Sequence, residues 1–223
     1  MHPLIDRASL HARLRAGTAA LGLAPSDAAL ESLLDYLELL TRWNAVYNLT
    51  AVRDPTAMVE RHLLDSLAIA PHVRGATLAD LGSGAGLPGI PLAILAPERR
   101  HVLIDSNGKK ARFLREAVRT LALANVRVEQ VRVEDARGVY DCITARAFAG
   151  LADMLARGGH LLAPDGVWLA MKGALDEHEM TAIPRGFRVA EVRALLVPGL
   201  GAARHLVIIR REPVAGRVHE HAA

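Results

Sequence analysis

The chain has 223 residues, of which 51% are hydrophobic, and this length suits one α/β domain with a modest extension. Only 4% of the residues are aromatic, which favours helices packed on a parallel sheet over a β-sandwich. No stretch of about 18 apolar residues and no secretory signal pattern is present, so we expect a cytoplasmic protein without a membrane span. The single cysteine, Cys142, excludes an internal disulfide, and the net charge of +3 is too small to identify a partner.

The first part of the chain is predicted to be helical. Helices are expected at 4–22, at about 26–40 with a leucine stripe, and at about 55–67. Polar and large apolar residues are mixed without a clear period between the second and third of these, which predicts an irregular segment at 43–54. We therefore predict an N-terminal helical extension, residues 1–75, packed on the rest of the same folded unit.

From residue 76 onward, strand-like and helical patterns alternate. Strands are expected at 77–81, 101–105, 126–131, 140–145, 167–171, 187–194 and 205–210, and helices at 88–96, 108–123, 150–157 and 173–181. Alternation of this kind builds a parallel sheet with helices on both faces. The last two strands are joined by a loop with glycine and proline and no helix, which predicts an antiparallel hairpin. The prediction is a mostly parallel seven-stranded sheet at 76–211, followed by a flexible tail at 212–223.

A glycine-rich loop joins the first of these strands to the next helix. It reads Asp80-Leu81-Gly82-Ser83-Gly84-Ala85-Gly86-Leu87-Pro88-Gly89. Glycine permits positive φ and close approach of a ligand, and the loop lies where open α/β sheets bind ligands. Glycines also gather in ordinary turns, so the surrounding residues must decide between the two interpretations.

The surrounding residues favour an adenosine-bearing cofactor. Asp105 ends the second strand about 20 residues after the glycines, where NAD and S-adenosylmethionine both place ribose hydroxyls. Val133 and Glu134 follow the third strand and are candidates for the adenine edge. No Gly-Lys-Ser/Thr follows the loop, which argues against nucleoside triphosphates. Asp80 would repel a pyrophosphate and attract an ammonium group, so S-adenosylmethionine is favoured and NAD remains an alternative.

The helix after Asp105 carries a basic stripe. Lys109, Arg112, Arg115 and Arg119 fall on one side of the predicted helix, and apolar residues fall on the other. Such a stripe beside a cofactor site is a candidate track for RNA phosphates. A solvated helix face is an equally good interpretation of the same pattern.

Several short blocks together resemble one known family. They are Arg42-Trp43-Asn44, Tyr47-Asn48-Leu49-Thr50, Val52-Arg53-Asp54-Pro55, Arg61-His62-Leu63-Leu64-Asp65-Ser66, the loop from Gly82 to Pro91, Leu103-Ile104-Asp105-Ser106 with Lys109, Arg112-Phe113-Leu114, Arg146-Ala147-Phe148, Met171-Lys172-Gly173 and Arg204-His205-Leu206-Val207. Their order from about residue 30 to 211 is similar to that of the small-subunit (16S) ribosomal RNA guanine-N7 methyltransferases, also known as glucose-inhibited division protein B. The main departures, a short segment before Tyr140 and a basic first helix, touch none of these blocks.

The resemblance implies a fold, a cofactor and a reaction. The fold is that of the class I S-adenosylmethionine-dependent methyltransferases, which is Rossmann-like, and the reaction is methyl transfer from S-adenosylmethionine to N7 of one guanine. The implied partner is 16S rRNA or the small ribosomal subunit. No metal is expected, and the chain is expected to act as a monomer.

The resemblance also implies roles for single residues. The cofactor-binding set comprises Asp80, Gly82, Ser83, Gly84, Gly86, Leu87, Asp105, Val133, Glu134 and Arg146. Asn48, Arg53, His62 and Asp65 resemble polar residues of the RNA-facing cleft, where catalysis is expected. Lys109 and Lys172 join them as RNA contacts, together with the rest of the basic stripe. For His62, an ordinary structural role is an equally good interpretation.

The chemistry of the acceptor fits the residues present. Guanine N7 has a free lone pair, so no general base is needed, and the main requirements are alignment and exclusion of water. Asp65 is a candidate for stabilising the cationic product base. The Asn/Asp-Pro-Pro-aromatic signature of amino-group methylation is missing after the fourth strand, and Cys142 lies inside a strand and not at its mouth. The alternatives are another RNA site, a small-molecule acceptor, an NAD-dependent enzyme or an RNA-binding module without catalysis.

Overall fold

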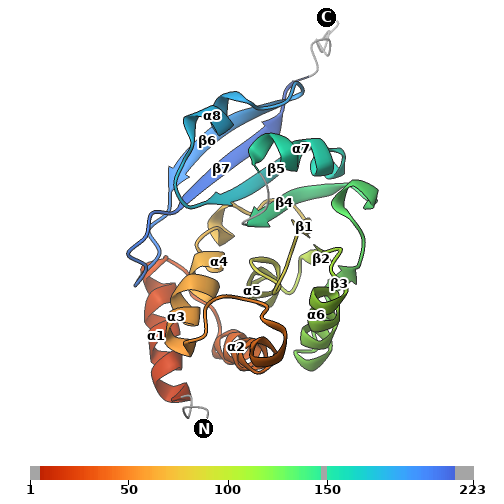
Figure 1. Ribbon diagram of the computed structural model, residues 1–223. Coiled ribbons are helices and arrows are strands. Elements are labelled where there is room, and N and C mark those ends of the chain that lie inside the picture. The colour runs from red at the N-terminus through yellow and green to blue at the C-terminus, as the bar shows by residue number, and fades with distance from the viewer. Residues whose placement is uncertain (1–5, 147–149, 214–223) are drawn as a thin grey trace, which may run out of the picture.

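The computed structural model describes residues 6–146 and 150–213, in which a seven-stranded sheet carries helices on both faces (Figure 1). The strands are β1 (Thr77–Leu81), β2 (Arg100–Ile104), β3 (Val126–Glu129), β4 (Tyr140–Arg146), β5 (Leu162–Lys172), β6 (Phe187–Ala194) and β7 (His205–Arg211). The helices are α1 (Arg7–Ala20), α2 (Asp27–Tyr47), α3 (Pro55–Met58), the π-helix η1 (Val59–Leu64), α4 (Asp65–Leu67), α5 (Gly89–Leu95), α6 (Gly108–Thr120), α7 (Leu151–Gly158) and α8 (Glu177–Thr181). Three short 3-10 turns are η2 (Ala70–His72), η3 (Val133–Asp135) and η4 (Gly159–Leu161).

The sheet has the strand order β3-β2-β1-β4-β5-β7-β6. Its first five strands pair in parallel, and β7 runs antiparallel to both β5 and β6. The predicted mostly parallel sheet with a final antiparallel hairpin is therefore confirmed. In the parallel part the carboxyl ends of all strands lie along one edge, and β1 is flanked there by β2 and β4. This edge is where an open α/β sheet binds ligands.

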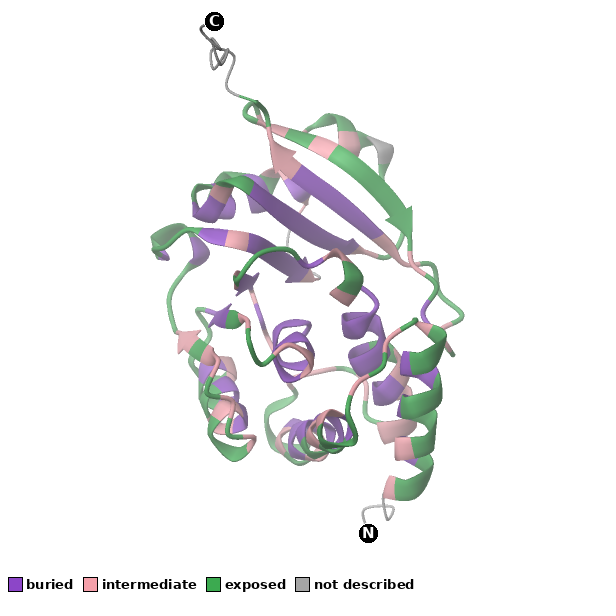
Figure 2. Ribbon diagram, turned by 180° about the vertical axis from the view of Figure 1, so that it is seen from behind, coloured by how far each residue is buried: buried purple, intermediate pink, exposed green. Residues whose placement is uncertain are grey.

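The two faces of the sheet are covered by different helices. Figure 1 shows α7 and α8 on one face and α2, α4, α5 and α6 on the other. The leucine stripe of α2 is buried in the core of this second face, as its period of three and four residues predicts. Figure 2 shows the central strands buried, whereas β6 at the sheet edge is mostly exposed. Within the described residues, no helix is long and apolar enough to cross a membrane.

The N-terminal helices differ from the expected pattern in two places. Helix α2 continues into the segment expected to be irregular and ends at Tyr47, because Asn48 takes a left-handed φ of 50° and caps the helix. Residues 48–54 are irregular, as expected. Trp43 and Tyr47, one turn apart, pack their rings at 5.2 Å between centroids and support this last turn. The helix expected at 55–67 is interrupted by the π-helix at Val59–Leu64, which hydrophobic periodicity alone did not reveal.

The side chain of Asp141 binds the chain where it enters β1. One carboxylate oxygen of Asp141, at the start of β4, accepts hydrogen bonds from the backbone N–H groups of Ala76 at 2.8 Å and Thr77 at 3.0 Å. The Thr77 hydroxyl donates a third bond to the same oxygen at 2.9 Å. These donors hold the pKa of Asp141 below its ordinary value, the Thr77 hydroxyl contributing most. The carboxylate therefore fixes the entry of the chain into β1.

We expect Asp141→Ala to lower the free energy of unfolding by about 2 kcal/mol, because three hydrogen bonds to a charged acceptor are lost. Chemical denaturation measured at neutral pH tests this. Asp165→Ala is the matched control, since Asp165 lies exposed on β5 and its side chain makes no hydrogen bond or ion pair within residues 6–146 and 150–213. Equal stability of the two variants would contradict the role given to Asp141.

Candidate functional site

The glycine-rich loop is fastened to the end of β2. The N–H groups of Gly82 and Ser83 both donate to the carbonyl of Ile104, at 2.9 and 3.1 Å. The Ser83 hydroxyl accepts from the N–H of Ile104 at 3.1 Å. Gly86 has a φ of 86°, and a Cβ there would overlap the side chains of Ile90 and Leu114. The loop therefore requires glycine for both its backbone conformation and its packing.

Asp80 lies beneath this loop. Its carboxylate is 0% exposed and accepts from the Thr144 hydroxyl at 3.0 Å and the Gly89 N–H at 3.1 Å. Burial raises its pKa to about 7, against the opposing effect of these donors. In this arrangement Asp80 supports the start of α5 and presents no free face to solvent, so the expected contact with a cofactor ammonium group remains a prediction.

Asp105 borders the loop at its outer side. One carboxylate oxygen accepts from the Gly84 N–H at 2.9 Å, and the other accepts from the Asn107 N–H at 2.8 Å. A carboxylate has further lone pairs, so hydroxyl donors can still be bound. Val133 is buried and Glu134 exposed in the 3-10 turn after β3. These acids and the loop line one edge of the sheet, an arrangement that fits the ribose and base of an adenosine.

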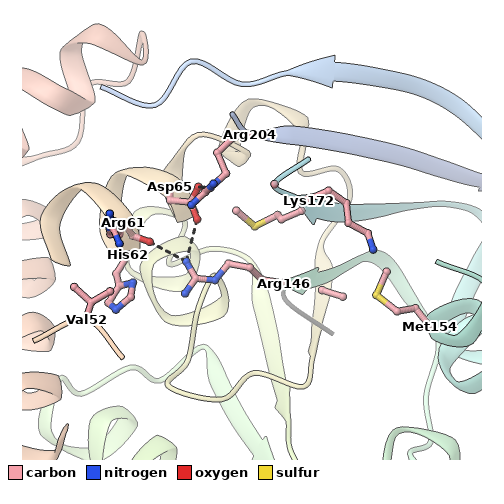
Figure 3. Close-up of a pocket in the computed structure, with 11 residues that line it drawn as sticks. Val52, Arg61, His62, Asp65, Arg146, Met154, Lys172 and Arg204 are labelled. Atoms are coloured by element: carbon pink, nitrogen blue, oxygen red, sulfur yellow. Dashed lines mark hydrogen bonds and ion pairs between the residues drawn. The ribbon is translucent and has the colours of Figure 1, made fainter. Parts of the chain in front are cut away.

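A pocket of about 390 Å³ opens at the ends of β4 and β5, on the β4 side of β1 and of the loop that follows it. Asp65 lies in its wall, only 3% exposed, between two arginines (Figure 3). Arg146 at the end of β4 donates to one carboxylate oxygen at 3.0 Å, and Arg204 donates to the other at 2.9 Å. A buried carboxylate needs such partners, because removal from water otherwise costs several kcal/mol. The ion pairs join three segments that are far apart in sequence.

The π-helix presents two more groups to this pocket. The carbonyl oxygen of Arg61 accepts a second hydrogen bond from Arg146, at 3.1 Å. His62 is 4% exposed, and its Nε2 lies 2.9 Å from the hydroxyl of Thr50. Its Nδ1 is buried and has no hydrogen-bond partner in the described part of the chain. Burial lowers the pKa of His62 to about 4, so the imidazole is neutral at physiological pH.

Comparison with known proteins identifies the family. The sequence profile described as rRNA small subunit methyltransferase G matches residues 29–207. The chain belongs to this family. Ribosomal RNA small subunit methyltransferase G of Stenotrophomonas maltophilia is 56% identical over 211 residues, which cover 93% of this chain and 97% of the relative. The protein of the same name from Xanthomonas campestris pv. campestris is 58% identical over 182 residues, covering 81% of this chain and 86% of the relative.

A solved structure supports the fold assignment of this family member. The mitomycin 7-O-methyltransferase MmcR matches with a TM-score of 0.57 and 17% identity, covering 92% of this chain and 72% of that one. At this identity the likeness concerns the fold alone. The predicted Rossmann-like fold of S-adenosylmethionine-dependent methyltransferases and the predicted family are therefore confirmed.

All but two of the predicted site residues of this family member are assigned to three places. The first is the loop edge already described, and the second is the pocket, which brings together His62, Asp65, Arg146 and Lys172. Lys172 pairs there with Glu179 at 2.8 Å. Arg146 was expected at the cofactor. It is bound to Asp65 in the pocket wall and its charge also acts on Asp80 beneath the loop, so its contact with the cofactor remains a prediction.

Asn48 and Arg53 lie outside the pocket. They are exposed and bond to each other at 2.9 Å, so their expected place in the cleft remains a prediction. The basic stripe of α6 is the third place. Its arginines are exposed and its apolar residues Phe113, Leu114 and Ala117 are buried, as the helical wheel predicts.

Several pocket residues were not selected from the sequence. Arg204 and Arg61 belong to blocks that carry the family resemblance, which was the signal by which they could have been selected. Nothing in the sequence showed that the side chain of Arg204 reaches Asp65. Met154 and Met171 supply the apolar lining, and their pattern is that of ordinary core residues. Phe148, which belongs to another of those blocks, lies outside the described residues. Within residues 6–146 and 150–213, no three His, Cys, Asp or Glu side chains are grouped to hold a metal ion.

We expect the imidazole of His62 to stay neutral from about pH 8 down to about pH 5. A titration followed by NMR measures this, and the signal that is missing in His62→Gln identifies His62. A midpoint near the ordinary value of 6.5 would contradict its burial. Because the unfolded histidine binds its proton near 6.5 and the folded one near 4, stability falls as pH drops through this window. His62→Gln should reduce that loss by up to about 1.4 kcal/mol per pH unit.

Proposed function

We propose that this chain transfers a methyl group from S-adenosylmethionine to N7 of one guanine in the 16S rRNA of the small ribosomal subunit. The observation that carries the proposal is the family match over residues 29–207, together with relatives at 56–58% identity that are named ribosomal RNA small subunit methyltransferase G. The pocket of Asp65 lies beside the glycine-rich loop, as an acceptor site beside a cofactor site requires. A cytoplasmic location is part of the proposal, because the proposed substrate is ribosomal RNA.

The residues of the loop edge suit the cofactor. Gly82 and Gly84 have positive φ and carry no side chain toward the opening, and a Cβ at Gly84 would meet only the Gly82 carbonyl, at 3.7 Å. Asp105 offers acceptors for ribose hydroxyls, and Val133 with Glu134 lies beyond β3 where the base would be held. When bound, S-adenosylmethionine supplies a methyl group on a positively charged sulfur.

The side chains of the pocket then have to orient the guanine and exclude water. N7 of guanine is nucleophilic without deprotonation, so no residue has to remove a proton, and the neutral state of His62 is compatible with a hydrogen-bonding role. Arg146, Arg204 and Lys172 offer donors to guanine O6 or to a neighbouring phosphate. Met154 and Met171 give the pocket apolar walls that keep water away from the reacting atoms.

Asp65 acts in this proposal as a positioning residue. Direct stabilisation of the cationic product base was the earlier expectation, but both carboxylate oxygens are engaged by arginines. Asp65 instead holds the planes of Arg146 and Arg204 in fixed orientations. The pocket lining carries four cations and one carboxylate, Arg61 and Lys172 being the other cations. Glu179 pairs with Lys172, and the remaining excess of positive charge attracts RNA phosphates.

The first test concerns the product. We expect 16S rRNA from a strain that lacks this protein to have one 7-methylguanine fewer than wild type, because the proposed reaction is the one that forms this base. Borohydride reduction and aniline cleavage followed by primer extension locates the base. Complementation with the wild-type chain should restore cleavage. Identical cleavage patterns in the deletion and wild-type strains would exclude this substrate.

The second test concerns the cofactor. We expect Asp105→Asn to weaken binding of S-adenosylmethionine by about tenfold, because a charged acceptor for ribose hydroxyls and for the Gly84 N–H is lost. Isothermal titration calorimetry measures this directly. Asp165→Asn is the matched control, an exposed acid on β5 away from the loop. Unchanged affinity in Asp105→Asn would remove this residue from the cofactor site.

A further inference from the structure

A second groove lies between α2 and α6, on the other side of the glycine-rich loop from the Asp65 pocket. It has a volume of about 950 Å³. Its lining comes from the last turn of α2, the exposed side of α6 and the end of β3: Trp43, Tyr47, Asn107, Gly108, Lys109, Arg112, Arg115, Glu116, Arg119 and Gln130. Asn107 caps α6 two residues after Asp105, so the groove begins at the edge of the proposed cofactor site. The two concave sites therefore flank the loop after β1, one toward β2 and the other toward β4 and β5.

We infer that this groove binds a single-stranded RNA segment that flanks the target guanine, with a base stacked on Tyr47 and phosphates held by Lys109 and Arg112. The inference rests on the proposed function, since it concerns the same substrate. The groove would be a second RNA-contact region. Its residues on α2 and those on α6 lie more than 50 positions apart in the sequence.

The charges of the groove are available for a partner. The side chains of Lys109 and Arg112 are exposed and make no hydrogen bond or ion pair with any residue that the structure describes. Arg119 is different, because it is bound to Glu116 at 2.8 and 3.1 Å. Arg115 donates only one long bond, at 3.3 Å, to the neutral Gln130. The free cations thus lie in the half of the groove nearer the cofactor loop, whereas Arg119 at the far end is neutralised.

The aromatic side chains of Trp43 and Tyr47 distinguish this groove from an ordinary solvated helix face. Trp43 packs against the buried Phe113 of α6 at 5.6 Å between centroids, and Tyr47 packs on Trp43 at 5.2 Å. Tyr47 is nevertheless 36% exposed, so part of its ring faces the groove. A rigidly supported, half-exposed ring beside free cations is the arrangement with which proteins bind single-stranded nucleic acid. An acidic peptide would use the same cations but would gain little from the ring.

Tryptophan fluorescence gives a direct readout of the groove. The chain has two tryptophans, of which Trp168 is 0% exposed in the core and Trp43 lines the groove. We expect oligoadenylate to quench this fluorescence on titration, because a stacked base lies beside Trp43. Inorganic polyphosphate, an anion without bases, should bind with little quenching. Trp43→Phe should abolish the quenching while oligoadenylate affinity, measured by fluorescence anisotropy, stays within about threefold of wild type.

Two substitutions and one control test the contacts. Tyr47→Ala should weaken oligoadenylate binding about tenfold, as expected for loss of one stacked base. Arg112→Ala should weaken it and reduce the slope of log affinity against log salt by about 0.7. Arg188→Ala removes the same charge from exposed β6 at the opposite edge of the sheet and should change neither. Binding of S-adenosylmethionine confirms that each variant is folded.

The outcomes distinguish this inference from the proposed function. Wild-type affinity in both Tyr47→Ala and Arg112→Ala, or equal quenching by polyphosphate and oligoadenylate, would overturn the groove as an RNA site. An acidic peptide that displaces oligoadenylate and binds equally well to Tyr47→Ala would likewise overturn it and assign the cations to a protein partner. Methyl transfer to 16S rRNA by the wild-type chain, measured in parallel, reports on the proposed function alone.

Discussion

The negative charge of Asp65 is almost completely withdrawn from water, and the arrangement of the whole pocket depends on how that charge is compensated. An unpaired carboxylate at this depth would destabilise the fold by several kcal/mol. Arg146 and Arg204 supply the compensation, each from a different part of the sheet. The ion pairs therefore require that α4, the end of β4 and the segment before β7 come together. Stability and the shape of the proposed acceptor site are coupled through one side chain.

The N-terminal helices have a comparable link to the cofactor side. The buried phenol of Tyr36 on α2 donates to the carbonyl of Ala85 in the glycine-rich loop, at 2.6 Å. Helix α2 thus reaches the loop in its middle and the α6 groove at its end. A segment that lies outside the common methyltransferase core thereby borders both the cofactor and the proposed RNA surface. The blocks that carry the family resemblance accordingly include the end of α2 as well as the loop itself.

The parts of the fold governed by local pattern were predictable from the sequence. The strand from Thr77 to Leu81 and the amphipathic helix after Asp105 follow from apolar periodicity, and the structure places them within a few residues of expectation. The continuation of α2 to Tyr47 was missed because its last turn is stabilised by Phe113, which is distant in sequence. The π-helix at Val59–Leu64 was missed because a single extra residue per turn leaves no clear mark on periodicity.

The candidate site was also predictable only where it depends on local sequence, and not where it depends on contacts between distant segments. Residues near a motif, such as Asp105 and His62, could be proposed from the sequence, whereas the pairing of Arg204 with Asp65 spans 139 positions and depends on strand order. Alternation of strands and helices says that β6 and β7 form a hairpin, but not that β7 is the inner of the two. Burial was equally hidden, since nothing local shows that Asp80 and Asp105 are both buried, at 0% and 6% exposed.

The inner place of β7 has a consequence for synthesis of the chain. Residues 187–194 leave the ribosome before residues 205–211, yet β6 has no neighbour in the sheet until β7 has paired with β5. Arg204, which completes the compensation of Asp65, directly precedes β7. Without this segment Asp65 would keep only one of its two arginine partners. Completion of the pocket therefore depends on the same strand that closes the sheet.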